Sequence, residues 1–288
     1  MTRHILASTD FSKRSAIAIE RALALAELQG ASVTVVHVID EDQPTTMIEA
    51  ARREAEILIA PMSGQRGGVT IDHAIRVGDP HEAINQAAEE AGADLVVFGA
   101  HRQAGLRKAF LGTTAERAIR RSRVPALVVR NVGVGPYRKP VCALDLIHQD
   151  FNPWRGASAL SIMDEAAGSI LFAYESGSLD LLRKANKDIG GLENYLRAER
   201  EAVLPSVAKA MTDLGLKPEQ AHLLTTYFSP AETILDFAKR TNSDLIIVGS
   251  HQKSAIDRLM LGSVSGAVLT RSEIDVLIVP PAKAATRD

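Results

Sequence analysis

Two glycines and a threonine in the first half of the chain have the spacing of an anion-binding turn. Gly99 follows a short apolar run, residues 95–98, and Gly112 and Thr113 open a segment whose apolar positions recur at helical intervals. A glycine-containing turn that leads into a helix presents free backbone N–H groups and the positive end of the helix dipole. This combination is typical of a site for phosphate or another anion.

The same pattern recurs 150 residues later without a gap, since residues 243–280 align with residues 93–130. The residues that take the places of Gly99, His101, Gly112 and Thr113 are Gly249, His251, Gly262 and Ser263. A match that keeps its register over this length indicates a tandem duplication, so one half is the natural unit of interpretation.

Apolar runs alternate with helix-like segments in both halves. The strands expected in the first half span residues 4–8, 32–39, 69–77, 95–98 and 126–129, and those of the second half include residues 141–144, 169–174, 221–227 and 276–279. Strands that alternate with helices predict a parallel, doubly wound sheet. We therefore expect an α/β fold with two tandem domains, each a five-stranded, mostly parallel sheet with helices on both faces.

Local signals divide the chain further. Ser12 is expected to cap one helix, and Asp79 and Ser229, each followed by proline and later by glutamate, are expected to cap two others. Residues 61–68 and 99–111 are expected to be loops, and Asn152 with Pro153 to cap a helix. A polar, glycine-containing and proline-containing segment predicts domain boundaries at 1–131, 132–140 (a linker) and 141–288.

Composition excludes several classes of protein. The net charge of −2 gives no basic footprint for nucleic acid, and the arginines around Arg120 are interpreted as a solvated helix face. The one cysteine, Cys142, lies in an apolar run and is expected to be a core side chain. The chain shows neither a secretory segment nor an apolar run of about 18 residues, so we expect a cytoplasmic protein that does not enter membranes.

Several sequence motifs, taken in their order along the chain, resemble those of the universal stress protein family. In the first half the resemblance rests on TDFS after the first strand, VVHVID, GDP before a helix, DLVVFGAH and FLGTTAERAI. In the second half it rests on SDLIIVGSH and LMLGSVSGAVL. It covers essentially the whole chain, which is thus identified as a tandem member. The resemblance implies five-stranded domains that pair as an intramolecular pseudo-dimer; some members of the family bind ATP and others do not.

ATP-binding members carry a G-x2-G-x9-G-[ST] loop, an acidic residue after the first strand and a contact at the end of the second. The resemblance implies as binding residues Asp10, Val38, Gly99, Arg102, Gly112 and Thr113 in the first half, and Asp145, Tyr174, Gly249, Gly262 and Ser263 in the second. Arg102 and Gln252 replace the second glycine. A side chain there is expected to strain a backbone of positive φ by about 1 kcal/mol or more and to fill the phosphate space, unless Arg102 turns outward and binds phosphate itself.

Three functions remain. The preferred one is a non-enzymatic stress-response protein, a pseudo-dimer or a homodimer of such chains, that acts through protein partners. The second is a regulatory switch that binds ATP, with Mg²⁺, in one or both loops. The third is an enzyme of nucleotide chemistry, for which we predict neither catalytic nor metal-binding residues; His101 and His251 are expected to fix their loops. A co-purified nucleotide would favour the second hypothesis.

The last strand of each half bears on how the halves join. Residues 126–129 and 276–279 are expected to end their respective sheets. The family pattern and the short linker predict that these two edges meet, which would satisfy backbone groups that otherwise invite aggregation.

Overall fold

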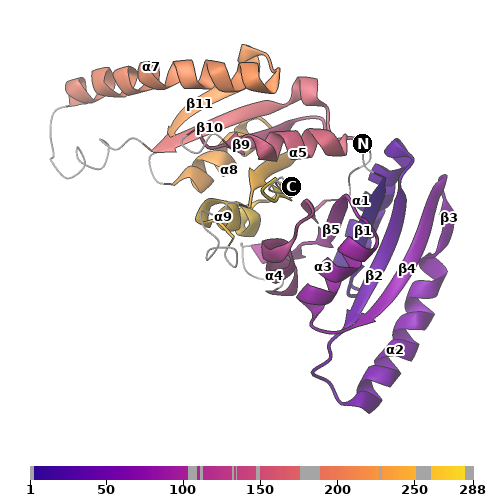
Figure 1. Cartoon of the computed structure of the whole chain (residues 1–288). Helices are drawn as coiled ribbons and strands as arrows, with labels where there is room; N and C mark the ends of the chain where they lie inside the picture. Colours follow the sequence, from indigo (N-terminus) through magenta and orange to yellow (C-terminus); the bar gives the residue numbers. More distant parts are fainter. Residues whose placement is uncertain are drawn as a thin grey trace, which may run out of the picture.

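One continuous sheet runs through the whole molecule (Figure 1). The structure is a computed structural model, and it describes residues 3–102, 109–110, 113–131, 133, 135–146, 150–175, 189–226, 229–250 and 261–282. The sheet has 11 strands in the order β11-β10-β9-β12-β13-β8-β5-β1-β2-β4-β3. The first half supplies β1 (His4–Thr9), β2 (Ser32–Ile39), β3 (Gly64–Arg66), β4 (Val69–Val77), β5 (Leu95–Gly99) and β8 (Ala126–Val129). The second half supplies β9 (Pro140–Leu144), β10 (Ser169–Glu175), β11 (Ala221–Thr226), β12 (Leu245–Gly249) and β13 (Asp275–Val279).

The two halves repeat the same strand order. Each has five parallel strands, β4-β2-β1-β5-β8 in the first half and β11-β10-β9-β12-β13 in the second. The first half adds β3, which pairs antiparallel with the start of β4. The expected tandem α/β architecture is confirmed.

The halves join through an antiparallel pair, β8 with β13. Leu127 lies opposite Leu277, with Val128 opposite Val276 and Ala126 opposite Ile278. Leu127 and Leu277 occupy the same position in the two sequence repeats, so a pseudo-twofold axis passes between them. The prediction that the two edge strands meet is confirmed, and neither edge is left open to a second chain.

Helices cover both faces of this sheet, as predicted (Figure 1). One core packs α1 (Lys13–Gln29), α2 (Thr45–Ile59), α5 (Asn152–Leu160) and α7 (Ile189–Leu214) against the first face. The other core packs α3 (Pro80–Glu90), α4 (Thr113–Arg121), α8 (Pro230–Arg240) and α9 (Ser263–Arg271) against the opposite face. No helix in the described part of the chain is long and apolar enough to span a membrane.

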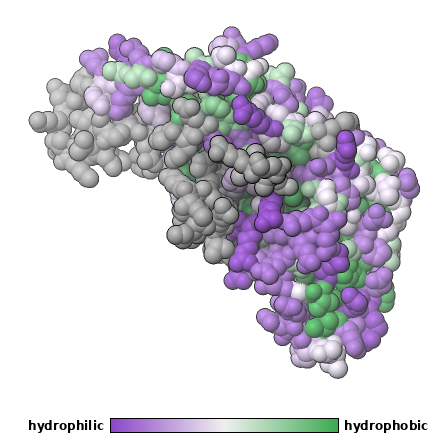
Figure 2. All heavy atoms as spheres, in the orientation of Figure 1, coloured by the Kyte–Doolittle hydropathy of each residue, from purple (hydrophilic) through white to green (hydrophobic). Residues whose placement is uncertain are grey.

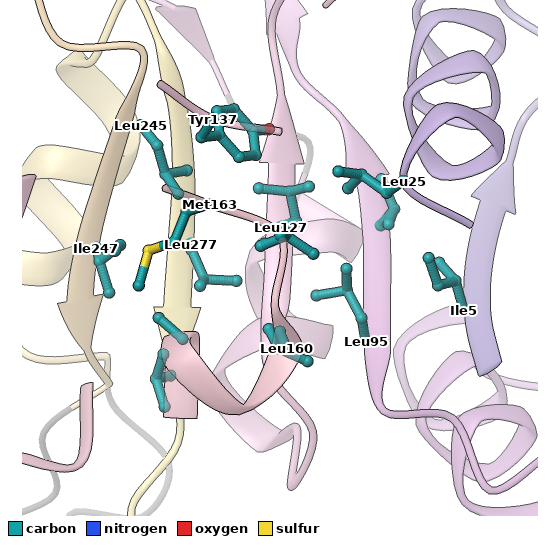
Figure 3. Packing of buried hydrophobic residues seen from close by; sticks show 14 of the residues in the cluster. Ile5, Leu25, Leu95, Leu127, Tyr137, Leu160, Met163, Leu245, Ile247 and Leu277 are labelled. Atoms are coloured by element: carbon teal, nitrogen blue, oxygen red, sulfur yellow. The ribbon is translucent and has the colours of Figure 1, made fainter. Parts of the chain in front are cut away.

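Each core crosses the junction between the halves. Figure 3 shows the first core running from Ile5 and Leu25 through Leu127 to Leu277 and Ile247. Cys142 is fully buried in the same core, as its apolar neighbours predicted. Because apolar surface is buried continuously across β8 and β13, the hydrophobic effect holds the halves together as well as each half by itself.

The predicted helix starts at three positions are confirmed. Ser12 accepts a hydrogen bond from the Ser15 N–H at 3.3 Å. Asp79 and Ser229 cap α3 and α8 in the same way, by accepting from backbone N–H groups in the first turn. These local signals work because each cap satisfies a helix N–H that has no partner within the helix.

Three local expectations were wrong. Part of residues 61–68 forms β3, and part of 99–111 forms a ribbon of β6 (His101–Arg102) and β7 (Ala109–Phe110). α5 begins at Asn152 with Phe151 as N-cap, and the Asn152 side chain instead donates to the Pro280 carbonyl at 2.5 Å. In each of the three cases a backbone or side-chain partner elsewhere in the chain outweighed local sequence preference. The segment 132–140 stays a prediction as the linker; it contains the buried Tyr137, and its last residue, Pro140, is the first residue of β9.

Candidate functional site

A cavity of about 380 Å³ opens at the carboxyl ends of β1, β2 and β5. After β1 the chain builds the sheet outward through β2 and β4, whereas β5 and β8 lie on the other side of β1. The cavity therefore lies where the strand order reverses, which is the usual ligand position in open parallel sheets. Three predicted residues line it together: Asp10, Val38 and Gly99.

The turn from β1 to α1 forms the polar wall of the cavity. Phe11 has a φ of 59°, an uncommon value for a residue with a side chain. Its N–H donates to the Thr9 hydroxyl at 3.0 Å, and its ring lies 4.4 Å from the His37 ring between centroids. The His37 ring nitrogen Nδ1 lies 2.9 Å from the Thr9 carbonyl oxygen and donates to it. The positive φ of Phe11 strains the backbone of this turn, and these contacts stabilise it. They also fix the position of Asp10.

Asp10 supplies negative charge to this wall. Burial raises the pKa of Asp10, but hydrogen bonds from Ser12 and Ser15 outweigh it and leave the pKa below its ordinary value. One of these bonds joins the Ser12 N–H to Asp10 Oδ1 at 3.0 Å. At neutral pH the carboxylate is ionised and can accept hydrogen bonds from a ligand with two adjacent hydroxyl groups.

The opposite wall consists of apolar side chains and the start of a helix. Val36, Val38, Ile84 and Phe98 line one side, and Thr114 in the first turn of α4 lines another. Thr113 is the first residue of α4, and Gly112 lies outside the described residues. The helix N-terminus places partial positive charge beside the cavity, opposite in sign to the charge of Asp10.

Gly99 is required here for a reason the motif did not supply. A Cβ atom at this position would lie 2.6 Å from the Arg14 carbonyl oxygen and 3.0 Å from the Ser15 nitrogen. The end of β5 therefore packs directly against the backbone of the first turn of α1. Only glycine allows this approach, whether or not an anion binds.

The matching region of the second half is arranged differently. Asp145 follows β9, and its backbone forms an isolated antiparallel β-bridge with that of Asp150. Gly249 ends β12, Gly262 caps α9, and Ser263 is the first residue of that helix. Ser265, which stands where the first half has Ala115, donates to the Gly249 carbonyl at 2.5 Å. This hydroxyl thus contacts β12 at the position where Ala115 lines the first-half cavity.

The expected equivalence of Tyr174 and Val38 was off by one residue. In the sheet register Leu6 pairs with Thr34, and its counterpart Val141 pairs with Ser169. Counting along both strands places Ala173 at the position of Val38. Because successive strand residues point to opposite faces, Tyr174 packs with the core on the other face, and its hydroxyl accepts from Thr225 at 2.8 Å.

The arginine in the phosphate loop does not strain the backbone. Arg102 belongs to β6 and pairs with Ala109, so its backbone is extended and any L-residue can adopt it. The backbone strain that a side chain could cause at a position of positive φ therefore does not arise at Arg102. His101 shares β6, whereas His251 and Gln252 lie outside the described residues. The described part of the chain holds no group of three or more His, Cys, Asp or Glu side chains placed to bind a metal ion.

Among the residues that sequence reasoning missed here, His37 and Phe11 hold the turn that positions Asp10. His37 directly precedes Val38 and lines the cavity, and its place beside a predicted contact was the signal that could have identified it. Phe11 could not be identified in this way, because nothing in its residue type indicates a positive φ.

The Gly99 packing gives a direct test. We expect Gly99→Ala to lower the free energy of unfolding by about 1–3 kcal/mol, because the new methyl group overpacks a backbone contact. Gly266→Ala is the matched control: it lies inside α9, its Cβ would meet nothing closer than 3.8 Å, and alanine favours the helix by about 1 kcal/mol. Urea unfolding of both variants measures the difference, and equal effects would contradict the close approach.

Both halves of the chain are similar to the same family of known proteins. A model described as the universal stress protein family matches residues 1–130 and 155–280. A universal stress protein of Mycolicibacterium smegmatis is 25% identical over 300 residues, which cover 96% of this chain and 97% of that relative. A universal stress protein of Methanocaldococcus jannaschii is 28% identical over 157 residues, which cover 45% of this chain and 96% of that relative.

Solved structures show the same fold over the full length. A universal stress protein from Archaeoglobus fulgidus superposes with a TM-score of 0.67 at 19% identity, covering 96% of this chain and 98% of that one. A functionally unknown protein from Pseudomonas aeruginosa gives a TM-score of 0.68 at 18% identity, covering 97% and 93%. At these identities the likeness concerns the fold.

Proposed function

Because the chain belongs to the universal stress protein family, with one match in each half, we propose that it is a non-enzymatic stress-response protein that binds an adenine nucleotide in its first half. The nucleotide acts as a regulatory ligand, and the response passes to protein partners in the cytoplasm. The observation that carries this proposal is the cavity that brings Asp10, Val38 and Gly99 together.

The chemistry of the cavity fits the parts of such a ligand. The ionised Asp10 suits the two hydroxyls of a ribose, and the apolar side with Val36, Val38 and Phe98 suits a planar base. The N-terminus of α4 suits phosphate groups, and Mg²⁺ would be bound mainly through the phosphates. A volume of about 380 Å³ falls within the range of small-molecule sites.

We assign the nucleotide to the first half on the contrast between the halves. In the second half the Ser265 hydroxyl donates a hydrogen bond to the Gly249 carbonyl, and Asp145 forms an isolated backbone β-bridge with Asp150. The proposed role of this half, residues 141–288, is to complete the pseudo-dimer and to contribute surface for partners.

Exposed apolar side chains support the protein-partner part of the proposal. Met47, Ile57 and Leu58 on α2 are 58%, 74% and 44% exposed, and Val77 at the end of β4 is 40% exposed. Figure 2 shows apolar patches over the outer part of the first half, around β4 and α2, on an otherwise mostly hydrophilic face. Exposed apolar patches are typical of surfaces that contact other proteins.

Calorimetric titration with ATP and Mg²⁺ tests the nucleotide proposal. We expect one equivalent to bind the protein after it has been stripped of small molecules. ATP at 100 times its dissociation constant should stabilise the folded state by about 2.7 kcal/mol, which raises the melting temperature by several degrees. Absence of binding to the wild-type protein would overturn the proposal.

The substitution Arg102→Gly tests whether Arg102 binds phosphate or blocks the phosphate position. Gln252→Gly in the second half is the matched control. If Arg102 binds phosphate, we expect Arg102→Gly to weaken ATP binding by about 10-fold or more, since a hydrogen bond to a charged group contributes about 1.5–3 kcal/mol. If Arg102 instead fills the phosphate space, the same change strengthens binding. Gln252→Gly should leave the first-half affinity unchanged in either case, and titration of both variants measures it.

A further inference from the structure

A buried cluster of three side chains lies at the junction between the halves, and we name it the junction cluster: Arg21 from α1, Tyr137 before β9, and Asp275 from β13. The side chains are almost completely enclosed, with residue exposures of 2%, 3% and 4%. Charged groups are rarely buried to this extent unless they are paired.

Contacts in the junction cluster join three separate parts of the chain. Arg21 Nε donates to the Tyr137 hydroxyl at 3.2 Å, and its guanidinium carbon lies 4.1 Å from the centre of the Tyr137 ring. The Tyr137 hydroxyl donates to Asp275 Oδ2 at 2.6 Å. Arg21 also donates to the carbonyls of Gly133 and Gly135 at 3.1 and 2.7 Å. A first-half helix, the connecting segment and a second-half strand thus share one network.

The other oxygen of Asp275 holds the end of β8. Asp275 Oδ1 accepts from the backbone N–H groups of Arg130 and Asn131, at 2.8 and 3.3 Å. The pseudo-twofold axis makes the corresponding pair on the other side of the junction easy to identify. There Pro125 stands in the place of Asp275 and Pro280 in the place of Arg130, and neither proline has a backbone N–H or a carboxylate.

The apolar part of the junction does not discriminate between partners. Leu127 opposite Leu277 is a pair of identical residues, and the flanking pairs are small or branched aliphatic residues on both strands. By itself, β8 would pair almost as well with β8 of a second copy as with β13. The junction cluster, together with Pro125 and Pro280 at the corresponding positions, does distinguish the two arrangements.

We propose that the junction cluster selects the partner of β8, so that β8 pairs with β13 and not with β8 of a second copy of this chain. In a β8–β8 pair, Pro125 of the second copy would stand where Asp275 now accepts hydrogen bonds. The Tyr137 hydroxyl and the Arg130 N–H would lose their acceptor, and Arg21 would lose the nearby charge of Asp275. Removing one partner of a buried charged pair is strongly unfavourable, and such penalties against the wrong partner are a general source of specificity.

A cysteine reporter tests which strand β8 contacts. With Leu127→Cys, the new thiol faces Leu277 in the native pairing, whereas a β8–β8 pair in the same register would place the new thiols of the two copies opposite each other. Directly opposed residues of antiparallel strands have Cα atoms about 4.5–5.5 Å apart, which suits a disulfide. Cys142 is fully buried in β9 and is common to every variant compared.

We expect Asp275→Asn to raise the fraction of disulfide-linked dimer at least about 10-fold over Leu127→Cys alone, under the same oxidising conditions. Asparagine keeps an acceptor oxygen for the two N–H groups but removes the negative charge that Arg21 stabilises electrostatically. Tyr137→Phe, a milder change, should shift the dimer fraction in the same direction. Non-reducing electrophoresis and light scattering measure the dimer, and circular dichroism verifies that each variant is folded.

Ile234→Ala in the Leu127→Cys background is the matched control. Ile234 is 2% exposed on α8 and belongs to the core on the other sheet face, so this change lowers stability without touching the junction cluster. If it raises the dimer fraction as much as Asp275→Asn does, general opening explains the dimer and the proposal fails. It fails equally if neither Asp275→Asn nor Tyr137→Phe raises the dimer fraction.

Discussion

Replacement of Arg21 by methionine should lower the free energy of unfolding by about 3–5 kcal/mol, the usual range for breaking one side of a buried charged pair. Methionine retains an unbranched side chain of similar length, so the packing around the stem is largely kept. Asp275 would lose its countercharge while 4% exposed, and the Gly133 and Gly135 carbonyls would lose their donor. Urea unfolding followed by circular dichroism measures the change.

This loss should depend on pH in a defined direction. Burial raises the pKa of Asp275, while the Tyr137 hydroxyl, the N–H groups of Arg130 and Asn131, and the charge of Arg21 lower it; burial prevails. Removing Arg21 raises the pKa of Asp275 further. A carboxyl group whose pKa is higher in the folded than in the unfolded state loses stabilising effect as pH rises through the folded-state pKa. The deficit of Arg21→Met should therefore be smaller at pH 5 than at pH 8.

Arg66→Met is the matched control for this experiment. Arg66 forms an ion pair with Glu20 at 2.7 Å, and its side chain is 61% exposed. Exposed pairs contribute about 0–1 kcal/mol because water already solvates both charges. A deficit for Arg21→Met as small as that for Arg66→Met would show that the buried cluster does not stabilise the junction.

The sequence predicted the parts of the fold that depend on local patterns and on the duplication. Apolar runs such as Leu95 to Phe98 gave the strands, and the caps at Asp79 and Ser229 gave the helix starts. Asp275 could be recognised only as a departure from Pro125 in the repeat. Its partner Arg21 lies on a helix of the other half, and no local pattern connects residues so distant in the chain.

Some residues of the candidate site were placed by the sequence and others were misplaced, for a related reason. Gly99 was singled out as a phosphate-loop glycine, but the structure shows that the Arg14 backbone already excludes any side chain. Tyr174 was misaligned because strand two of the second half starts at a different point, and an error of one residue moves a side chain to the opposite face. Motif spacing therefore brought Asp10, Val38 and Gly99 to one cavity but left the direction of individual side chains undetermined.

Asp10→Ala should weaken ATP binding by on the order of 100-fold, the other large effect that we expect. A hydrogen bond to a charged group contributes about 1.5–3 kcal/mol, and each 1.4 kcal/mol corresponds to a tenfold change in affinity. Asp10 lines the cavity beside Val38 and Gly99, and its lowered pKa keeps it ionised at neutral pH. Calorimetric titration of ATP with Mg²⁺ into both proteins measures the difference.

Two further variants separate binding from folding. Asp10→Asn keeps an acceptor for the Ser12 N–H, the 3.0 Å bond that shapes the turn, and should weaken binding through the loss of charge alone. Asp145→Ala removes the corresponding carboxylate of the second half and should leave the affinity unchanged, because we assign the nucleotide to the first half. If Asp145→Ala weakens binding and Asp10→Ala does not, the nucleotide site lies in the second half, and the contrast drawn from Ser265 and Asp145 is wrong.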